Sequence, residues 1–334
     1  MNFFVSEMTF LRYFIPLIKE GNRRGIRSVM YWYPCGKYNC PQKHMDVLKG
    51  LSKEVGFELK PLTEKITSQE PTFLVEGVGS KNFKGKKIAL SFVMDFCNGT
   101  YDSCIEDVDH FIFPNKRWTE FEEKPPRADN TIQYLRRPSL FNESKNLYLG
   151  SPKYDVYLDK SEIIKKYNLS ESKKCFFFYP KSRDLDKIDI NKTLNIINEL
   201  GYEVLIKYRA KDGCNIPNNK NVKVFKDDGW YPHTSMELIY VSDLVVNTDS
   251  GGVKECVLLK KPILNFKIKP FDNLVKFLYN EKFHLEIESP IDYNLIKDQL
   301  NKLALVKEID FEETINKYLF KPGASKRILD FLKM

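Results

Sequence analysis

Histidine, arginine and long apolar runs are scarce in this chain of 334 residues. It has 4 histidines and only 11 arginines against 42 lysines. No stretch approaches the roughly 18 consecutive uncharged apolar residues that a membrane-spanning helix needs. The apolar start of the chain is interrupted by Glu7 and Arg12, and it shows neither a basic segment nor a small-residue cleavage site. We therefore expect no secretory signal and a cytoplasmic location.

Cysteine is present, but in a pattern that excludes a disulfide scaffold. The chain has 7 cysteines, an odd number without framework spacing, so reduced thiols are expected. Cys35, Cys40 and His44 have a spacing that could suit part of a zinc site. A closed zinc site needs about four ligands, and no second pair with matching spacing occurs. We therefore predict no metal site.

The charge is positive but not concentrated along the sequence. Lysine and arginine exceed aspartate and glutamate by 53 − 45 = +8. The lysines are scattered rather than gathered into a stripe, which favours a solvated surface over nucleic-acid binding. A basic cleft that attracts an anionic substrate fits the same net charge.

The apolar residues that are present are enough for two hydrophobic cores. Hydrophobic residues make up 42% of the chain and aromatic residues 13%, and its length favours two domains. In the first half, apolar runs that read as strands alternate with amphipathic segments that read as helices. The predicted strands are 1–7, 28–34, 57–62, 72–78, 87–96 and 109–115, and the helices are 9–25 and 44–56.

A second alternating series follows a turn-rich connection and a short helix near residue 163. Its predicted strands are 175–180, 202–209, 222–225, 243–248 and 262–266. Its predicted helices are 190–201, 235–242, 251–260, 269–283, 291–306, 311–320 and 322–334. Alternation of this kind predicts an α/β protein with parallel, doubly wound sheets. Two Rossmann-like domains of this type bind ligands at the carboxyl ends of their strands, in a cleft.

The strongest local signal is the segment Thr248-Asp249-Ser250-Gly251-Gly252, between a buried strand and a helix. Glycines let the backbone approach a ligand, and a helix start offers free N–H groups and the positive end of its dipole. These features predict a phosphate-binding turn, with Glu255 placed for a ribose diol. The alternative is an ordinary helix N-cap with packing glycines.

This segment, with the Lys-Pro pair that follows it, resembles the nucleotide-binding segment of the two-domain GT-B glycosyltransferases. The similarity is nearest to the non-hydrolysing UDP-GlcNAc 2-epimerase branch and the CDP-glycerol glycerophosphotransferases. Two further segments fit this resemblance: residues 150–155 resemble an interdomain turn, and residues 322–332 a C-terminal helix that crosses back to the first domain. The resemblance covers residues 145–334 well, and the first half only in the order of its elements.

The sequence departs from the epimerases where their catalytic histidines occur. The loop after the first strand of the second domain is Tyr179-Pro180-Lys181-Ser182-Arg183, and the next is Lys207-Tyr208-Arg209-Ala210-Lys211. Neither contains histidine. Epimerisation removes a proton from a sugar carbon and needs matched acid and base groups. Their absence favours group transfer.

The basic loops suit a diphosphate leaving group. Arg183 and Arg209 follow neighbouring strands, and arginine offers a two-pronged donor for phosphate oxygens. Such donors stabilise developing charge without a metal. Thr234 and Glu237 have the spacing of a capping box, and His233 beside them could contact the base or diphosphate. The alternatives are surface lysines and arginines, and a structural histidine.

An acceptor hydroxyl needs a base, for which Glu7 and Asp95 at predicted strand ends are the candidates. The alternatives are a helix-terminal charge for Glu7 and a turn residue for Asp95. The predicted catalytic residues are Glu7, Asp95 and Arg209. The predicted nucleotide-binding residues are Arg183, Lys207, Arg209, His233, Thr234, Asp249, Ser250, Gly251, Gly252 and Glu255.

We therefore expect an acceptor domain at 1–150, a nucleotide-sugar domain at 151–312 and a returning helix at 313–334. The leading hypothesis is a metal-independent glycosyltransferase of polysaccharide biosynthesis. It would use a nucleotide-sugar donor, which the resemblance implies is UDP-linked, and a glycan, lipid-linked or polyol acceptor. The alternatives are a 2-epimerase-like enzyme, a CDP-polyol phosphotransferase and a non-catalytic nucleotide-binding scaffold. Peripheral membrane contact and a homodimer stay open, and no nucleic-acid partner is expected.

Overall fold

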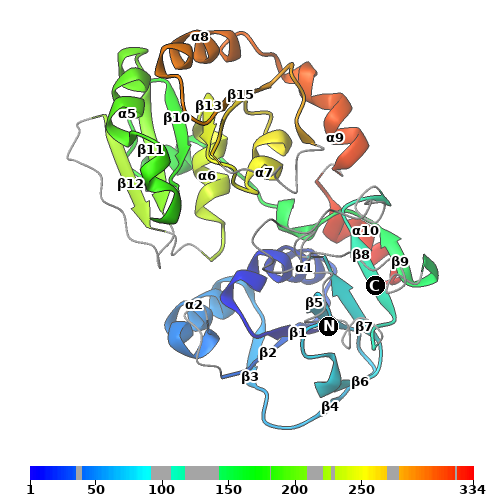
Figure 1. Ribbon diagram of the computed structural model, residues 1–334. Helices are drawn as coiled ribbons and strands as arrows, with labels where there is room; N and C mark the ends of the chain where they lie inside the picture. Colours follow the sequence, from blue (N-terminus) through cyan, green and yellow to red (C-terminus); the bar gives the residue numbers. More distant parts are fainter. Residues whose placement is uncertain are drawn as a thin grey trace. The chain divides into compact units, whose positions relative to one another are not determined.

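The computed structural model describes residues 1–34, 40–91, 107–116, 143–180, 182–208, 221–226, 230–268, 278–319 and 322–334. The chain forms two compact units (Figure 1). Unit 1 comprises Met1–Val156 and Tyr318–Met334, and unit 2 is Tyr157–Lys317. Among the described residues, no helix has the length and apolar character needed to cross a membrane.

Unit 1 is built on a seven-stranded parallel sheet in the order β3-β2-β1-β5-β7-β8-β9. Its strands are β1 (Asn2–Val5), β2 (Val29–Trp32), β3 (Glu58–Pro61), β5 (Thr72–Val75), β7 (Lys87–Leu90), β8 (His110–Phe113) and β9 (Asn146–Tyr148). A separate pair is formed by β4 (Ile66–Thr67) and β6 (Phe83–Lys84). The chain builds the sheet outward from β1 in one direction and then, from β5 on, in the other, which is the doubly wound order.

In the described part of unit 1, three helices and several short 3-10 turns accompany this sheet. The helices are α1 (Leu11–Arg23), α2 (Met45–Val55) and α10 (Ala324–Phe331), and the 3-10 turns are η1 (Met8–Phe10), η2 (Pro41–His44), η3 (Ser80–Asn82), η6 (Glu143–Lys145) and η7 (Pro152–Tyr154). Helix α1 buries Leu11, Phe14, Ile15 and Ile18, whose spacing of three to four residues places them on one face.

The predicted C-terminal helix is confirmed: α10 packs against α1 (Figure 1). Arg24, which follows α1, donates to the carbonyl of Met334 at 2.7 Å and pairs with Asp330 at 2.9 Å. The start of α10 is held by Asp155. Its carboxylate accepts hydrogen bonds from the amides of Gly323 (2.5 Å), Ala324 (3.1 Å) and Ser325 (2.6 Å). The two segments predicted at 150–155 and 322–332 therefore meet in one helix-capping contact.

Unit 2 contains a six-stranded parallel sheet in the order β12-β11-β10-β13-β14-β15. Its strands are β10 (Lys174–Phe178), β11 (Glu203–Tyr208), β12 (Val222–Lys226), β13 (Leu244–Asn247), β14 (Ile263–Lys267) and β15 (His284–Glu288). The direction of winding reverses between β10 and β13, which lie side by side with Phe177 opposite Val246. Open α/β sheets bind their ligands at such a reversal, beyond the carboxyl ends of the strands.

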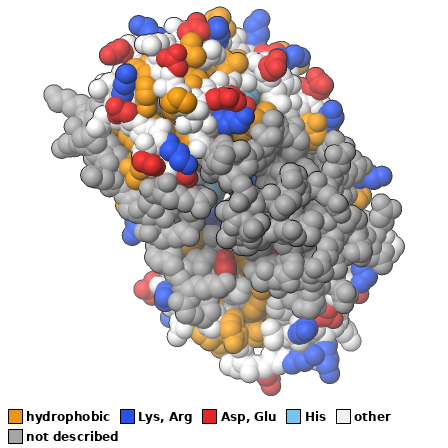
Figure 2. Space-filling view, viewed as in Figure 1, with side chains coloured by type: hydrophobic (Ala, Val, Ile, Leu, Met, Phe, Trp, Pro, Cys, Tyr) orange, Lys and Arg blue, Asp and Glu red, His pale blue; other side chains and the backbone are white. Residues whose placement is uncertain are grey.

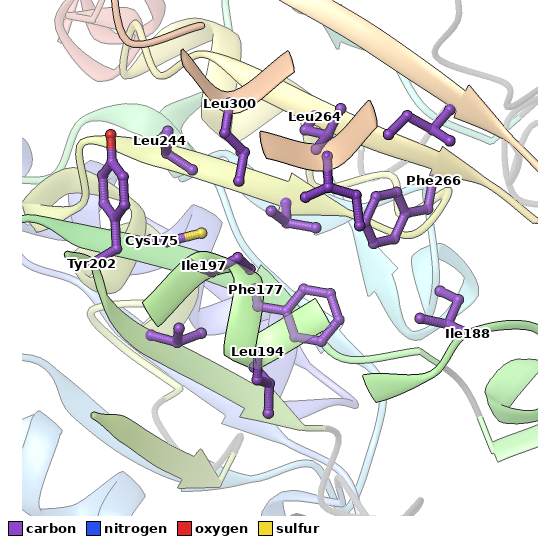
Figure 3. Close-up of a cluster of buried hydrophobic side chains, with 14 of the residues drawn as sticks. Cys175, Phe177, Ile188, Leu194, Ile197, Tyr202, Leu244, Leu264, Phe266 and Leu300 are labelled. Carbon is purple, nitrogen blue, oxygen red and sulfur yellow. The ribbon is translucent and has the colours of Figure 1, made fainter. Parts of the chain in front are cut away.

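The helices of unit 2 cover both faces of its sheet. They are α4 (Lys160–Lys166), α5 (Ile190–Glu199), α6 (Thr234–Val241), α7 (Val253–Leu258), α8 (Tyr293–Leu303) and α9 (Glu312–Tyr318, whose last residue belongs to unit 1), with the 3-10 turns η8 (Ser182–Lys187) and η10 (Glu308–Phe311). Figure 3 shows the core between the sheet and α5 and α8, where Phe177, Leu264 and Phe266 meet Leu194 and Leu300. Helices α6 and α7 pack together, and their buried residues lie outside that cluster.

Three sequence-based expectations differ from the structure. Strands β4, β6, β9 and β15 were not predicted, and β15 begins directly after the helix expected at 269–283. Residues 269–277 lie outside the described part of the chain, and 281–283 form a turn. The prediction of a capping box formed by Thr234 and Glu237 at the start of α6 is wrong, because the N-cap residue is His233. The carboxylate of Glu237 instead accepts from Lys166 Nζ at 2.8 Å and from Tyr167 Oη at 2.6 Å.

Candidate functional site

The turn Thr248–Gly252, which we call the donor turn, lies where the winding of the unit 2 sheet reverses. It follows β13 directly and leads into α7. Thr248 Oγ1 donates a hydrogen bond to the carbonyl of Phe178 at 3.0 Å, which joins the carboxyl ends of β13 and β10. The turn is thereby fixed to both strands at the ligand-binding edge that this topology provides.

Packing requires a glycine at one of the two glycine positions of the donor turn but not at the other. A Cβ atom on Gly252 would lie 2.2 Å from the ring of Phe178, so Gly252 is required by packing. At Gly251, no described atom lies within 4 Å of such a Cβ, and the backbone is not left-handed. Packing therefore explains Gly252, as the alternative interpretation held, but it does not explain Gly251.

The backbone amides of the donor turn are partly used by the turn itself. The amide of Asp249 donates to Asn265 Oδ1 (3.1 Å) and that of Ser250 to Asn247 Oδ1 (3.2 Å). The amide of Gly252 donates to Ser250 Oγ at 3.3 Å. In the described part of the chain, the N–H groups of Gly251 and Val253 find no acceptor. These two donors stand at the positive end of α7, an arrangement that suits an anion.

Asp249 forms the turn rather than extending from it. Its φ of +52° is left-handed, and its carboxylate accepts from Asn265 Nδ2 at 3.1 Å and from the amide of Ile268 at 2.9 Å. Asparagine and aspartate tolerate this conformation better than other residues with side chains. Direct nucleotide binding by Asp249 stays a prediction, and the contacts show that its carboxylate shapes the turn.

Glu255 lies in the first turn of α7 with 4% of its surface exposed. Burial, and secondarily the charge of Glu255, raise the pKa of the neighbouring Cys256 thiol well above its usual value. Cys256 therefore stays protonated and is not a candidate nucleophile. The predicted contact of Glu255 with a ribose is untested.

Lys207, His233 and Thr234 lie at the same edge of the sheet as the donor turn. Lys207 is the penultimate residue of β11 and is opposite Phe178 in register. Helix α6 follows β12 and begins at Thr234, with His233 as its N-cap. Helices that follow parallel strands begin at the carboxyl edge, so α6 and α7 start on the same side. The His233 side chain makes no capping hydrogen bond, and 9% of the residue surface is exposed.

The other predicted residues divide between unit 1 and the residues not described. Glu7 follows β1, next to the reversal of the unit 1 sheet, and its side chain makes no capping hydrogen bond to η1. Asp95 and Arg209 lie outside the described residues, as does the side chain of Arg183. Of the predicted nucleotide-binding residues, the structure places Lys207, His233, Thr234 and the donor turn at the carboxyl edge of the unit 2 sheet.

Sequence reasoning missed Asn247 and Asn265, which hold the donor turn from below. Both are fully buried, in strands β13 and β14, and Asn247 Nδ2 donates to Asn265 Oδ1 at 2.8 Å. A sequence signal existed: each is a lone amide in an apolar strand, and a buried amide needs hydrogen-bond partners.

The charges of the surface are mixed. On the face shown in Figure 2, basic and acidic side chains are interspersed over the described parts of both units. The positive net charge of +8 therefore forms no broad basic patch on the described surface of this face.

These features define a GT-B-type fold, with two Rossmann-like α/β units and a C-terminal helix that packs on α1. Solved structures match nearly the whole chain. A putative UDP-N-acetylglucosamine 2-epimerase from Listeria monocytogenes has a TM-score of 0.65 at 12% identity, covering 99% of this chain and 95% of that one. The wall teichoic acid polymerase TagF has a TM-score of 0.61 at 14% identity, covering 100% and 88%.

A third match is the spinosyn forosaminyltransferase SpnP, with a TM-score of 0.56 at 10% identity, covering 99% of this chain and 98% of that one. No protein-family model and no curated protein sequence matches the chain. Identities this low establish the fold and leave the activity to be argued from the site.

Proposed function

We propose that the protein is a metal-independent transferase that binds a nucleotide-activated donor, foremost a nucleotide sugar, at the donor turn of unit 2. The observation that carries this proposal is the pair of amides at Gly251 and Val253. Within the described residues these amides have no acceptor, and they lie at the reversal of the sheet, beside a glycine that no described neighbour requires. A diphosphate supplies the acceptor oxygens that these amides and the α7 dipole favour.

In this proposal the neighbouring residues have separate tasks. Glu255 accepts hydrogen bonds from the ribose hydroxyls, and His233 and Thr234 lie beside the base or the diphosphate. Lys207, Arg183 and Arg209 stabilise the negative charge that develops on the leaving diphosphate. Unit 1 binds the acceptor, and Glu7 or Asp95 removes the proton of its attacking hydroxyl.

A second candidate, transfer of a polyol phosphate from a CDP-linked donor, uses the same donor turn. The fold shared with the wall teichoic acid polymerase TagF makes it worth testing. In that reaction the leaving group is a nucleoside monophosphate rather than a diphosphate. Donor identity therefore separates the two candidates.

The test is calorimetric titration of the full chain with UDP, CDP, GDP and ADP, each with and without a chelator. We expect one of them to bind, and the chelator to leave its affinity unchanged. A ligand at a hundred times its dissociation constant also stabilises the protein by about 2.7 kcal/mol, which a melting curve detects. If none of the four binds, the proposal is wrong. If the chelator abolishes binding, the metal-independent mechanism is wrong.

The reaction itself is tested with the sugar nucleotides and the CDP-polyols of the base that binds. Release of nucleoside diphosphate would support sugar transfer, and release of monophosphate would support phosphotransfer. Release of neither would favour the 2-epimerase-like enzyme if the bound nucleotide sugar is converted to its epimer, and the non-catalytic scaffold if it is recovered unchanged.

A further inference from the structure

The side-chain amide of Asn265 lies at the centre of a hydrogen-bond network beneath the donor turn. Its Nδ2 donates to Asp249 Oδ1 at 3.1 Å and to Glu286 Oε1 at 2.8 Å. Its Oδ1 accepts from the Asp249 amide at 3.1 Å and from Asn247 Nδ2 at 2.8 Å. A side-chain amide has two donor hydrogens and two acceptor lone pairs, so all four are in use.

The network follows directly from the register of three strands. Asn247, Asn265 and Glu286 are paired across β13, β14 and β15, so their side chains share one face of the sheet. The preceding residue of β14, Leu264, belongs to the core cluster on the opposite face (Figure 3). Asn265 has 0% of its surface exposed, and three of its four hydrogen bonds lead toward the donor turn.

Two of the four bonds end on Asp249, the left-handed residue of the donor turn. A third reaches Asn247, whose Oδ1 accepts the amide of Ser250. The positions of Asp249 and Ser250 therefore depend on Asn265, directly or through Asn247. Gly251 follows them, and it has neither a side chain nor a packing neighbour within the described residues to hold it.

We infer that Asn265 is a positioning residue for nucleotide binding: it holds the donor turn so that the amides of Gly251 and Val253 converge on one phosphate group. This inference rests on the proposed function for its ligand. It adds a residue that does not touch the ligand, lies in the next strand, and sets the affinity through Asp249 and Asn247.

The experiment compares Asn265→Ala with Leu264→Ala in the full chain. The two residues are neighbours in β14 and both are fully buried, but only Asn265 contacts the donor turn. Leu264→Ala leaves a cavity in the core, so it should lower the melting temperature at least as much as Asn265→Ala. Any loss that is specific to the turn therefore appears in Asn265→Ala alone.

The first readout is hydrogen exchange of peptides covering residues 247–256 in the ligand-free protein. We expect exchange about tenfold faster in Asn265→Ala than in Leu264→Ala, because the turn loses the side chain that orders it. This readout needs no nucleotide. Equal exchange in the two variants would overturn the inference whether or not the proposed function holds.

The second readout is the affinity for UDP and CDP, by calorimetry at a temperature where both variants are folded. We expect binding about tenfold weaker in Asn265→Ala, and within about threefold of the parent in Leu264→Ala. Faster exchange with unchanged affinity would overturn the positioning role. A parent protein that binds none of UDP, CDP, GDP and ADP would refute the proposed function, and with it the ligand named here. Faster exchange in Asn265→Ala would in that case still retain Asn265 as the residue that orders the turn.

Discussion

The two units place corresponding turns at the reversals of their sheets, and the turns share one packing device. In unit 1, a Cβ on Gly79 would lie 2.2 Å from the ring of Phe4, in β1. In unit 2, a Cβ on Gly252 would lie 2.2 Å from the ring of Phe178, in β10. In each unit the first strand of the sheet therefore supplies a phenylalanine that only a glycine can face.

Each of these turns also contains an acidic residue with left-handed backbone. Glu76 follows β5 with a φ of +51°, and Asp249 follows β13 with a φ of +52°. The two turns differ in what holds them. In unit 1 the backbone does so: the amide of Glu76 donates to Leu90 O at 3.0 Å, and that of Val78 to Val75 O at 2.9 Å. In unit 2 the side chains of Asn247 and Asn265 do so.

The difference shows how one topology yields two kinds of edge. In unit 1 the turn continues with the amides of Ser80 and Asn82 bonded to the carbonyls of Gly77 and Gly79. A turn closed by its own backbone uses its own donors. A turn anchored by side chains from neighbouring strands can keep some amides for a ligand, as Gly251 and Val253 do in the described structure.

The largest effect is expected where the shared packing device is broken. Gly79→Ala combines a ring clash with a φ of +81°, for a loss of about 2–5 kcal/mol in the free energy of unfolding. Gly252→Ala meets the clash alone, because its φ is −65°, and should lose about 1–3 kcal/mol. Urea denaturation of both variants checks this. Equal losses would show that the left-handed backbone of Gly79 adds nothing to the cost of the substitution.

The next effect separates stability from binding within unit 2. Glu237→Ala removes the buried acceptor of Lys166 and Tyr167, and should lower the free energy of unfolding by about 1.5–3 kcal/mol. Glu255→Ala should instead weaken nucleoside diphosphate binding by about tenfold, because it removes the acceptor of a ribose hydroxyl. Denaturation and calorimetry on both variants give the comparison. A weaker affinity in Glu237→Ala than in Glu255→Ala would remove Glu255 from the site.

Acid should distinguish the units through their histidines. Burial lowers the pKa of His284 in unit 2 from its usual 6.5 to about 3. The unfolded chain then binds more protons between these values, so stability is complete above pH 6.5 and falls as the pH drops. The slope from this group is about 1.4 kcal/mol per pH unit.

The rings of His284 and Tyr279 are stacked with their centroids 3.7 Å apart, so the variant His284→Phe keeps a ring against Tyr279. This variant should flatten the slope of stability against pH between pH 6.5 and 5. His110 in unit 1 is only half-buried, and burial lowers its pKa as well. His110→Phe is thus the matched control, with a smaller change expected. Parallel pH profiles for His284→Phe and the parent protein would contradict the assignment.

The smallest effect on stability is expected at Gly251. No described atom lies within 4 Å of a Cβ at Gly251, and its backbone conformation is ordinary. For Gly251→Ala the free energy of unfolding should therefore change by less than about 0.5 kcal/mol. Its affinity for a nucleoside diphosphate should still fall by about tenfold, since the added methyl group blocks close approach to the amides. Unchanged affinity would indicate that no ligand approaches this glycine.

The sequence predicted the elements whose periodicity is strong and missed those that depend on tertiary contacts. Strands such as 175–180 and 243–248 are short apolar runs, and both are confirmed, as is the doubly wound fold. Strand β15 carries exposed Glu286 and Glu288 at an edge of the sheet, so it lacks the apolar run by which strands such as 243–248 were recognised. The capping box failed because Glu237 has partners 70 and 71 residues away in sequence.

The site was predictable in part for the same reason. The donor turn is contiguous in sequence, so its glycines and helix start could be recognised. The residues that hold it in place include Asn265 in β14 and Phe178 in β10, the two strands on either side of β13. Only the pairing of these strands brings the two residues to the turn. Nor could the sequence tell Gly251 from Gly252, because the difference is a ring 74 residues earlier in the chain.

The helix-capping contact between Asp155 and the start of α10 has a consequence for the order in which the two units can fold during synthesis. Unit 1 lacks α10 until the ribosome has passed the whole of Tyr157–Lys317. Asp155 is synthesised long before Gly323, Ala324 and Ser325. The hydrogen bonds from their amides to its carboxylate can therefore form only at the end of synthesis. Unit 2 is contiguous and can fold while synthesis continues. The first unit to emerge is therefore the last to be completed, and nascent chains stalled before residue 323 should expose the surface of α1 that α10 later covers.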